Sequence, residues 1–266
     1  GAIDLVGTGG DKSGTFNIST VSAFVVAAAG VPVIKHGNRS ASSKCGSADV
    51  LEKLGASIKL KAHQVERVFN EIGLAFMYAP MFHPAMKYVM PARRALGFRT
   101  FFNILGPMCN PAGVKRYVIG AFSKDVAEKM AHILANLHTS FAYTISSQDG
   151  LDELSLTARA EVYEIKDSMV SSSLLFDPES LGFERVDMVE LLGGDASENA
   201  QIFENILEND ATDAQRNIVL LNAAFAIQAA GKVSTLAEAK VLAEESMESG
   251  RARQMLDNYI EITNYV

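Results

Sequence analysis

The chain has 266 residues, 48% of them hydrophobic and 21% charged, and it carries a formal net charge of −7 at pH 7. That length allows one large domain or two modest ones with a substantial core. The acidic balance argues against a nucleic-acid partner, and no apolar run reaches the roughly 18–20 residues of a membrane span without polar interruption. The two cysteines, Cys45 and Cys109, form neither a zinc pattern nor a disulfide framework, so we expect a cytoplasmic protein with no membrane partner.

Short apolar runs alternate with segments of helical periodicity over the first two-thirds of the chain. Strands are predicted at residues 3–6, 33–34, 74–78, 117–122, 142–146 and 160–165. Helices are predicted from a cap at Ser19 or Thr20 to 29, from Ser47 to 55, at 62–72, from 84 to 96 with a kink at Pro91, and at 124–137, with a loop at 103–113. From residue 197 the pattern is helical, at 198–208, 212–230, 235–249 and 251–264. This order predicts an α/β fold, a sheet of mostly parallel strands flanked by helices.

The first candidate site is "GTGGDKSGTFNIST", which follows the first predicted strand; residues 7–17 of it are called the glycine loop. It is not a dinucleotide fingerprint, because Lys12 stands where the third glycine belongs, and not a P-loop, because Thr15 stands where lysine belongs. A glycine-rich turn into a helix still favours anions through free N–H groups and the helix dipole. The alternative is a tight turn that only lets the helix pack on the strand.

The second candidate is "KHGNRSASSKCGS", residues 35–47, called the basic loop. Lys35, Arg39 and Lys44 lie among small residues directly after a predicted strand and before a predicted helix. Positive charge, hydroxyl donors and free amides in one loop suit a di- or triphosphate group. The alternative is a solvated basic loop.

The third candidate is the acid pair, Asp152 and Glu153, in "GLDELS". A polar turn would explain two adjacent carboxylates. Beside two phosphate-type loops, however, they suit Mg²⁺, which takes one or two protein carboxylates together with substrate phosphate oxygens.

The fourth candidate is "MPARRALGFRT", which holds Arg93, Arg94 and Arg99 around the end of a predicted helix. Arginines there complement a helix C-terminus. One arginine that faces inward could instead bind a substrate carboxylate with both of its terminal nitrogens.

Together these motifs resemble one family. "GTGGDKSGTFNIST", "KHGNRSASSKCGSAD", "FFNILGPMCNPA" and "GLDELSL", in this order and at these separations, are similar to anthranilate phosphoribosyltransferases, and the similarity extends to "GGDASENAQIF" and "RNIVLLNAA". The resemblance implies the fold of class III phosphoribosyltransferases and pyrimidine nucleoside phosphorylases, a large α/β domain hinged to a small helical domain. It places residues 1–266 in the large domain, with a helical C-terminal third, and we expect the family's N-terminal helical domain to be absent from this chain.

The resemblance also implies an activity and a set of site residues. The family transfers the phosphoribosyl group of 5-phosphoribosyl-1-diphosphate (PRPP) to the amine of anthranilate in tryptophan biosynthesis, releasing diphosphate. It implies Mg²⁺ ions held by Ser19 and by Asp152 with Glu153, and anthranilate contacts from Asn38 and Arg93, with His36 and Gly7 close by. The residues expected to line the PRPP site are Gly7, Gly10, Asp11, Thr15, Asn17, Ile18, Ser19, Thr20, Lys35, His36, Gly37, Asn38, Arg39, Ser40, Ala41, Ser42, Ser43 and Ser47.

The expected catalysis is positioning and electrostatics, with Lys35, Asp152 and Glu153 as the catalytic group. An arylamine is unprotonated at neutral pH, so it needs no strong general base, and cations can stabilise the departing diphosphate. Cys45 departs from the family pattern, where a small hydroxyl residue is expected. Family members are usually homodimers, and the absence of the first helices puts dimerisation, closure and activity of this chain in question.

Two alternatives remain on the same fold. A pyrimidine nucleoside phosphorylase would cleave uridine or thymidine with phosphate and would not use the acid pair as a magnesium site. A non-catalytic, nucleic-acid-binding relative is disfavoured by the glycine loop, the acid pair and the net charge of −7.

Overall fold

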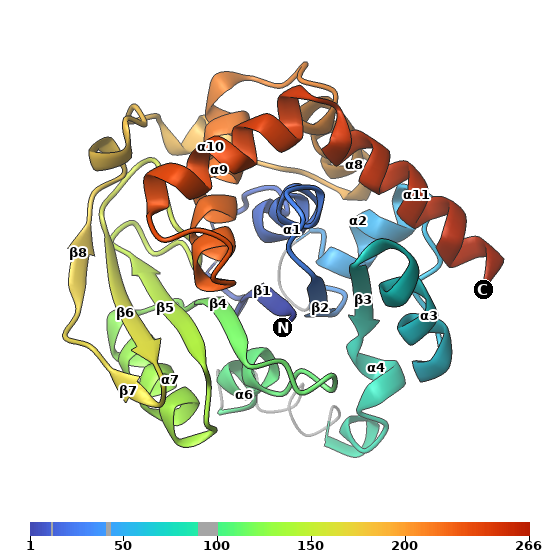
Figure 1. Ribbon diagram of the computed structural model, residues 1–266, viewed down its shortest axis with the longest axis horizontal. Helices are drawn as coiled ribbons and strands as arrows, with labels where there is room; N and C mark the ends of the chain where they lie inside the picture. Colours follow the sequence, from blue (N-terminus) through green and yellow to red (C-terminus); the bar gives the residue numbers. More distant parts are fainter. Residues whose placement is uncertain (12, 41–43, 90–100) are drawn as a thin grey trace.

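The computed structural model describes residues 1–11, 13–40, 44–89 and 101–266. Within these residues one sheet of eight strands runs in the order β3-β2-β1-β4-β5-β6-β7, with β8 beside β6 (Figure 1). The strands are β1 (Ile3–Gly7), β2 (Val33–Gly37), β3 (Leu74–Tyr78), β4 (Arg116–Gly120), β5 (Phe141–Ser147), β6 (Ala160–Lys166), β7 (Met169–Val170) and β8 (Leu174–Phe176).

The first five strands pair in parallel, and β6, β7 and β8 extend the sheet in antiparallel pairs. This confirms the predicted class of a mostly parallel sheet. The chain leaves β1 for β2 and β3 on one side and then returns to β4 on the other side of β1. Such a reversal opens a crevice at the carboxyl ends of the strands, which is where open α/β sheets bind ligands.

Helices cover both faces of the sheet (Figure 1). α1 packs on β1 and against α9, α10 and α11, whereas α7 packs on β5 and β6. The helices are α1 (Ile18–Ala28), α2 (Ser47–Lys53), α3 (Ala62–Ile72), α4 (Ala79–Phe82), α6 (Phe102–Met108), α7 (Lys124–Asn136), α8 (Ala196–Leu207), α9 (Asp213–Ala229), α10 (Leu236–Glu248) and α11 (Arg251–Tyr265), with short 3-10 turns η1 (Pro178–Leu181) and η2 (Met188–Leu191).

The helix after the glycine loop is buried as its apolar sequence requires. Nine of the eleven residues of α1 are buried, because the helix lies between the sheet and the C-terminal helices. Its N-cap is Asn17, two or three residues before the predicted cap at Ser19 or Thr20. The difference matters, because it places Ser19 in the first helical turn, where its N–H group donates to the acid Glu153 rather than within the helix.

Strand β2 is longer than predicted and contains the start of the basic loop. Lys35, His36 and Gly37 continue the strand, each opposite a residue of β3. Charged and small polar residues hide this extension from a hydrophobicity pattern, since they are not typical of a buried strand.

The structure corrects one predicted helix cap and one predicted loop. Ser47 is the first residue of α2 rather than its cap, which is Gly46. The segment predicted as a loop at 103–113 begins with helix α6. Pro107 lies inside this seven-residue helix, where it cannot donate a hydrogen bond to the preceding turn, so a proline-containing segment is predicted as a loop. Of the helix predicted at 84–96, residues 86–89 are helical and 90–96, including Pro91, lie outside the described residues.

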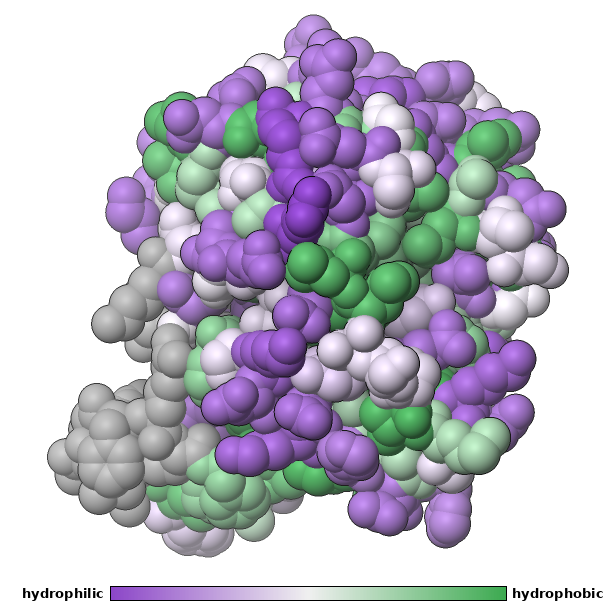
Figure 2. Space-filling view, turned by 90° about the vertical axis from the view of Figure 1, so that its left-hand side faces the viewer, coloured by the Kyte–Doolittle hydropathy of each residue, from purple (hydrophilic) through white to green (hydrophobic). Residues whose placement is uncertain are grey.

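The antiparallel end of the sheet carries exposed apolar side chains. Met169, Leu174 and Leu175 are 72%, 63% and 43% exposed, and Figure 2, which looks at the side where β8 lies, shows hydrophobic residues grouped near its centre. This edge is separated from β1 by β4, β5 and β6, so it does not shape the crevice. Among the described helices, none has the length and apolar content needed to span a membrane.

Candidate active site

The acid pair lies in the loop after β5, against the carboxyl ends of β1 and β4. Asp152 is 7% exposed, and Gly7 and Gly120, which pair across the two strands, both approach it. A Cβ atom on Gly7 would lie 2.5 Å from Asp152 Oδ2, and one on Gly120 would lie 1.5 Å from the Asp152 carbonyl oxygen. Both positions therefore require glycine, and they let the acid pair reach the mouth of the crevice.

The two carboxylates are held by N–H groups at the start of the chain. Asp152 Oδ2 accepts hydrogen bonds from the Gly9 N–H at 2.5 Å and from Thr8 Oγ1 at 3.4 Å. Glu153 Oε1 accepts from the Ser19 N–H at 3.0 Å, in the first turn of α1. Glu153 Oε2 is buried and has no hydrogen-bond partner among the described residues.

Burial raises the pKa of both acids well above the range of an exposed carboxyl. For Asp152 the second cause is the charge of Asp11, and for Glu153 it is the charge of Asp152. A bound cation would stabilise the ionised forms of these two adjacent buried carboxyl groups, whose pKa values are raised without it.

Lys35 brings positive charge to the same place from strand β2. Its Nζ donates to the Leu5 carbonyl and, at 3.2 Å, to Ser19 Oγ. Burial lowers the pKa of the ammonium group, while the charges of Asp4 and Glu153 oppose that shift. Ser19 consequently contacts Lys35 through its hydroxyl and Glu153 through its backbone.

The side chain of Asp4, near the start of β1, bridges β1 and β2. The strands β1 and β2 are paired at Ile3 and Val33, and side chains link them further along. Asp4 accepts a hydrogen bond from the His36 N–H at 3.2 Å. Asn110 Nδ2 donates to Asp4 Oδ2 and to the Ile34 carbonyl, both at 2.8 Å. Burial raises the pKa of Asp4 to about 6. The sequence alone does not reveal Asp4 as a site residue, because a lone acid in a predicted strand belongs to no motif.

His36 lies at the other side of β2, against the helix α6. Its Nδ1 is 3.3 Å from the Gly106 carbonyl oxygen, and its ring packs edge-on against His83 with centroids 5.1 Å apart. Burial lowers the pKa of His36 to about 4, so the ring is neutral at physiological pH. The Nε2 atoms of both rings are buried and without hydrogen-bond partners in the described part of the chain.

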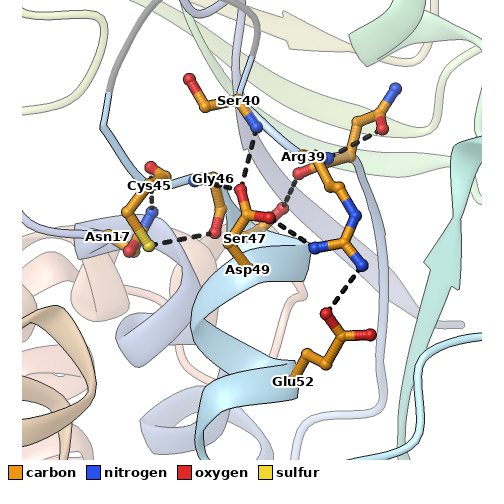
Figure 3. A network of polar contacts seen from close by, with 9 residues as sticks. Asn17, Arg39, Ser40, Cys45, Gly46, Ser47, Asp49 and Glu52 are labelled. Carbon is orange, nitrogen blue, oxygen red and sulfur yellow. Dashed lines mark hydrogen bonds and ion pairs between the residues drawn. The ribbon is translucent and has the colours of Figure 1, made fainter. Parts of the chain in front are cut away.

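The basic loop is shaped by an acid on helix α2, as Figure 3 shows. Asp49 Oδ2 accepts from the Gly46 N–H at 2.9 Å and from the Ser40 N–H at 3.2 Å, which closes the loop on itself. Arg39 forms ion pairs with Asp49 at 2.6 Å and Glu52 at 2.7 Å. Arg39 is thus bound to α2 in this structure. Asp49 was missed from the sequence, although an acid at the third position of a helix is the signature of a capping box.

The other predicted PRPP-site residues occupy the two loops and the elements next to them. Asp11 and Thr15 share the Ser13 hydroxyl, at 2.5 and 3.2 Å, and Asn38 accepts from the Ser47 hydroxyl with its carbonyl at 3.2 Å. Gly10 has a positive φ of 76°, Gly37 has no room for a Cβ beside the Ser47 hydroxyl, and the side chains of Ile18 and Thr20 are buried in α1. The predicted residues Ala41, Ser42, Ser43 and Arg93 lie outside the described residues, as does Lys12.

The chemistry of the donors fits Mg²⁺. Asp152, Glu153 and the Ser19 hydroxyl bring oxygen ligands together, and one Glu153 oxygen is buried without a hydrogen-bond partner among the described residues. No cluster of three or more histidine, cysteine or acidic side chains suited to a metal is found among the described residues. Mg²⁺ does not require one, since it is held by one or two carboxylates, by waters and by substrate phosphates.

This fold and this crevice define a class. A family model described as "Glycosyl transferase family, a/b domain" matches residues 1–253. Enzymes of that class transfer a sugar, which fits a crevice with a glycine loop, a buried lysine and an acid pair.

The similar proteins narrow the class. The anthranilate phosphoribosyltransferase of Geotalea uraniireducens is 47% identical over 262 residues, covering 98% of this chain and 74% of the relative. The crystal structure of the Thermus thermophilus enzyme is 39% identical, covers 99% of this chain and 78% of that one, and superposes with a TM-score of 0.92. The Saccharomyces cerevisiae enzyme in complex with PRPP and Mg is 29% identical, covers 100% of this chain and 74% of that one, and has a TM-score of 0.92.

The chain belongs to the anthranilate phosphoribosyltransferases of this glycosyltransferase family. This confirms the resemblance that the four motifs predicted.

Proposed function

We propose that this chain transfers the phosphoribosyl group of PRPP to anthranilate, giving N-(5-phosphoribosyl)anthranilate and diphosphate, as a step of tryptophan biosynthesis. The observation that carries the proposal is the convergence of the glycine loop, Lys35 and the acid pair, with Ser19 in contact with both Lys35 and Glu153. In the reaction the amine nitrogen bonds to C1 of the ribose, the bond from C1 to the diphosphate oxygen breaks, and diphosphate leaves with the electron pair. The amine proton passes to solvent.

Asp152 and Glu153 hold one Mg²⁺ in this proposal, and the Ser19 hydroxyl contacts a second one. The support is the buried, unpartnered Glu153 oxygen and the raised pKa of both acids, which favour a bound cation. When bound, Mg²⁺ offsets the charge that develops on the leaving diphosphate. The yeast relative has been solved in complex with PRPP and Mg, which supports a role for the metal together with this substrate.

Lys35 supplies a fixed positive charge from the floor of the crevice. Its Nζ is already held by the Leu5 carbonyl and the Ser19 hydroxyl, so it needs little reorganisation as diphosphate departs. The remaining residues of the two loops contact PRPP with N–H groups and hydroxyls, which the glycines of the glycine loop and the small residues of the basic loop support.

Anthranilate binds beside β2, in contact with Asn38 and close to His36 and Gly7. The neutral, largely buried ring of His36 supports this position, because an aromatic acid needs an apolar wall for its ring. The yeast relative has also been solved in complex with 4-fluoroanthranilate. Arg93 is assigned to the anthranilate carboxylate on the resemblance alone, since it lies outside the described residues.

The test is the loss of anthranilate fluorescence on addition of PRPP, with and without Mg²⁺. The wild-type chain should turn over only with the metal, and Glu153→Gln and Asp152→Asn should each lower kcat/KM by about 100-fold or more, because each removes a carboxylate from the metal site. Glu179→Gln, which changes an exposed acid paired with Arg185, is the matched control and should leave the rate unchanged.

Uridine phosphorolysis with inorganic phosphate is measured in parallel. Cleavage of uridine without any reaction of anthranilate would establish the phosphorylase alternative and overturn the proposal. A homodimer in the cytoplasm also follows from the resemblance and stays a prediction, to be checked by light scattering and by fractionation.

A further inference from the structure

Asn199 is a buried amide on helix α8 that joins three segments far apart in the sequence. It is 3% exposed; its Oδ1 accepts from the Gly194 N–H at 2.7 Å, and its Nδ2 donates to Asn17 Oδ1 at 3.0 Å. Asn17 in turn donates through Nδ2 to the Cys45 carbonyl at 3.2 Å, a contact drawn in Figure 3. A continuous chain of amides therefore links α8, the glycine loop and the basic loop.

The segment before α8 is built against the glycine loop. Residues 191–193 lie antiparallel to it, with Thr15 paired to Leu192 and with the Gly193 N–H donating to the Gly14 carbonyl at 2.9 Å. The sequence motif "GGDASENAQIF" has this placement, which its resemblance to the family did not explain.

Gly193 of that motif is needed for the close approach. A Cβ on Gly193 would lie 2.4 Å from Asn199 Oδ1 and 2.7 Å from the Phe16 backbone, whereas one on Gly194 would meet the side chain of Glu198. The backbone is thus fitted closely around Asn199, and the amide has one fixed orientation because each of its atoms has an assigned partner.

The side chain of Asn17 makes this link instead of capping its own helix. It is the N-cap residue of α1, yet its side chain makes no cap hydrogen bond to the first turn. The first-turn N–H of Ser19 is instead bonded to Glu153. Asn17 is therefore oriented by Asn199 and Cys45 rather than by its own helix.

We propose that Asn199 is a positioning residue that sets, through Asn17, the spacing between the glycine loop and the basic loop, so that both loops contact one PRPP molecule. This rests on the proposed function. Asn199 does not touch the substrate; it fixes the amide of Asn17 and, with it, the start of α1 relative to Cys45. The loops that bind the two ends of a sugar diphosphate must be held at a fixed distance for the bound geometry to be productive.

The experiment measures binding of PRPP with Mg²⁺ to the whole chain by titration calorimetry, with the melting temperature recorded for each variant. Asn199→Ala and Asn199→Asp should each raise the Kd for PRPP about tenfold. Asn199→Asp keeps an acceptor for the Gly194 N–H but offers no amide donor to Asn17, so it separates the two contacts. Gln201→Ala, which removes an exposed hydrogen bond to Asn205 on the same helix, is the control and should bind as the wild type does.

A double-mutant cycle tests the route of the effect. If Asn199 acts through Asn17, the Kd of Asn17→Ala/Asn199→Ala should equal that of Asn17→Ala alone; fold-changes that multiply would overturn the proposal. So would an Asn199→Asp variant that binds PRPP as tightly as the wild type, because its role would then be to hold Gly194. A wild-type chain that binds no PRPP with Mg²⁺ would overturn the proposed function as well, and the two failures are thereby distinguished.

Discussion

Arg39 on the basic loop is bonded to two carboxylates, at 2.6 and 2.7 Å, whereas Glu153 in the acid pair has one oxygen with no hydrogen-bond partner among the described residues. The first charge is half-exposed and satisfied within its own loop and helix. The second is buried beside another acid, which raises its pKa. Both regions lie at the carboxyl ends of the strands, so the difference between the satisfied arginine and the unsatisfied carboxylate indicates different roles for the two regions.

An unsatisfied buried carboxylate lowers the stability of a fold, and it persists where a ligand completes it. We infer that the acid pair is preorganised for a cation. The basic loop is preorganised by its own ion pairs, which hold its N–H groups and hydroxyls in place. Arg39 is bonded to helix α2 in this structure, so the proposed source of positive charge beside the acid pair is Lys35.

The largest effect should come from the glycine on which the acid pair rests. Gly120→Ala would place a Cβ 1.5 Å from the Asp152 carbonyl oxygen, so backbone must move against backbone. We expect the free energy of unfolding to fall by about 3 kcal/mol or more, with loss of PRPP binding, because overpacking of this kind cannot be relieved by a side-chain rotation. Urea unfolding followed by circular dichroism measures the change.

Gly106→Ala is the control for that substitution, since a Cβ there would meet nothing within 4 Å. It should change the free energy of unfolding by less than about 1 kcal/mol. Equal effects of the two substitutions would show that the close approach of β4 to the acid pair carries no special weight.

Much of this architecture follows from the sequence, and the reasons are local. Alternating apolar runs and helical periodicity place β1, β3, α3 and the four C-terminal helices within a few residues, because burial sets those patterns. The glycine loop and the acid pair are visible as motifs, and their order in the chain matches one family.

What could not be predicted depends on contacts between distant residues. The extension of β2 through Lys35 and His36 is paired with β3, and the His36 N–H donates to the side chain of Asp4. The link from Asn199 to Asn17 spans 182 positions, and no spacing rule reaches that far. The pairing of Arg39 with α2 was missed for the same reason, since a cation in a loop does not reveal its partner.

A smaller loss of stability is expected from a substitution that weakens the closure of the basic loop. Asp49→Asn keeps the size of the side chain but weakens its bonds to the Gly46 N–H and to Arg39. We expect a loss of about 1–2 kcal/mol in the free energy of unfolding, together with weaker PRPP binding, because the loop is no longer closed. Chemical denaturation at pH 7 measures it, and Glu52→Gln, an exposed partner of the same arginine, should change stability by less than about 0.5 kcal/mol.

The pH dependence of the stability difference between the wild type and Asp49→Asn tests whether the charge of Asp49 stabilises the basic loop. Burial acts to raise the pKa of Asp49, but its hydrogen bonds from Gly46 and Arg39 outweigh burial and lower it below the ordinary 3.8. A depressed acid pKa contributes stability that is present above the unfolded value and lost as the pH falls through the folded one. The gap between wild type and Asp49→Asn should therefore narrow below about pH 4, and a gap that does not depend on pH would mean that the charge of Asp49 is irrelevant.

The smallest expected effect has the opposite sign and comes from the acid pair. Glu153→Gln replaces a carboxyl whose pKa is raised by burial, so the metal-free fold no longer has to hold it either protonated or as a charge without a full set of partners. We expect the free energy of unfolding without Mg²⁺ to rise by about 1 kcal/mol, although the same substitution abolishes metal-dependent binding of PRPP. Glu71→Gln, in an exposed pair with Arg67, should leave stability within about 0.5 kcal/mol of the wild type.

Adding PRPP and Mg²⁺ should then reverse the order of stability. Ligands that bind only the native state stabilise it in proportion to their affinity, so the wild type should gain several degrees in melting temperature and Glu153→Gln should gain none. If Glu153→Gln instead lost stability without ligands, its charge would be satisfied within the fold like that of Asp49. The two sides of the crevice would then be alike, and the acid pair would have no reserved role in binding a cation.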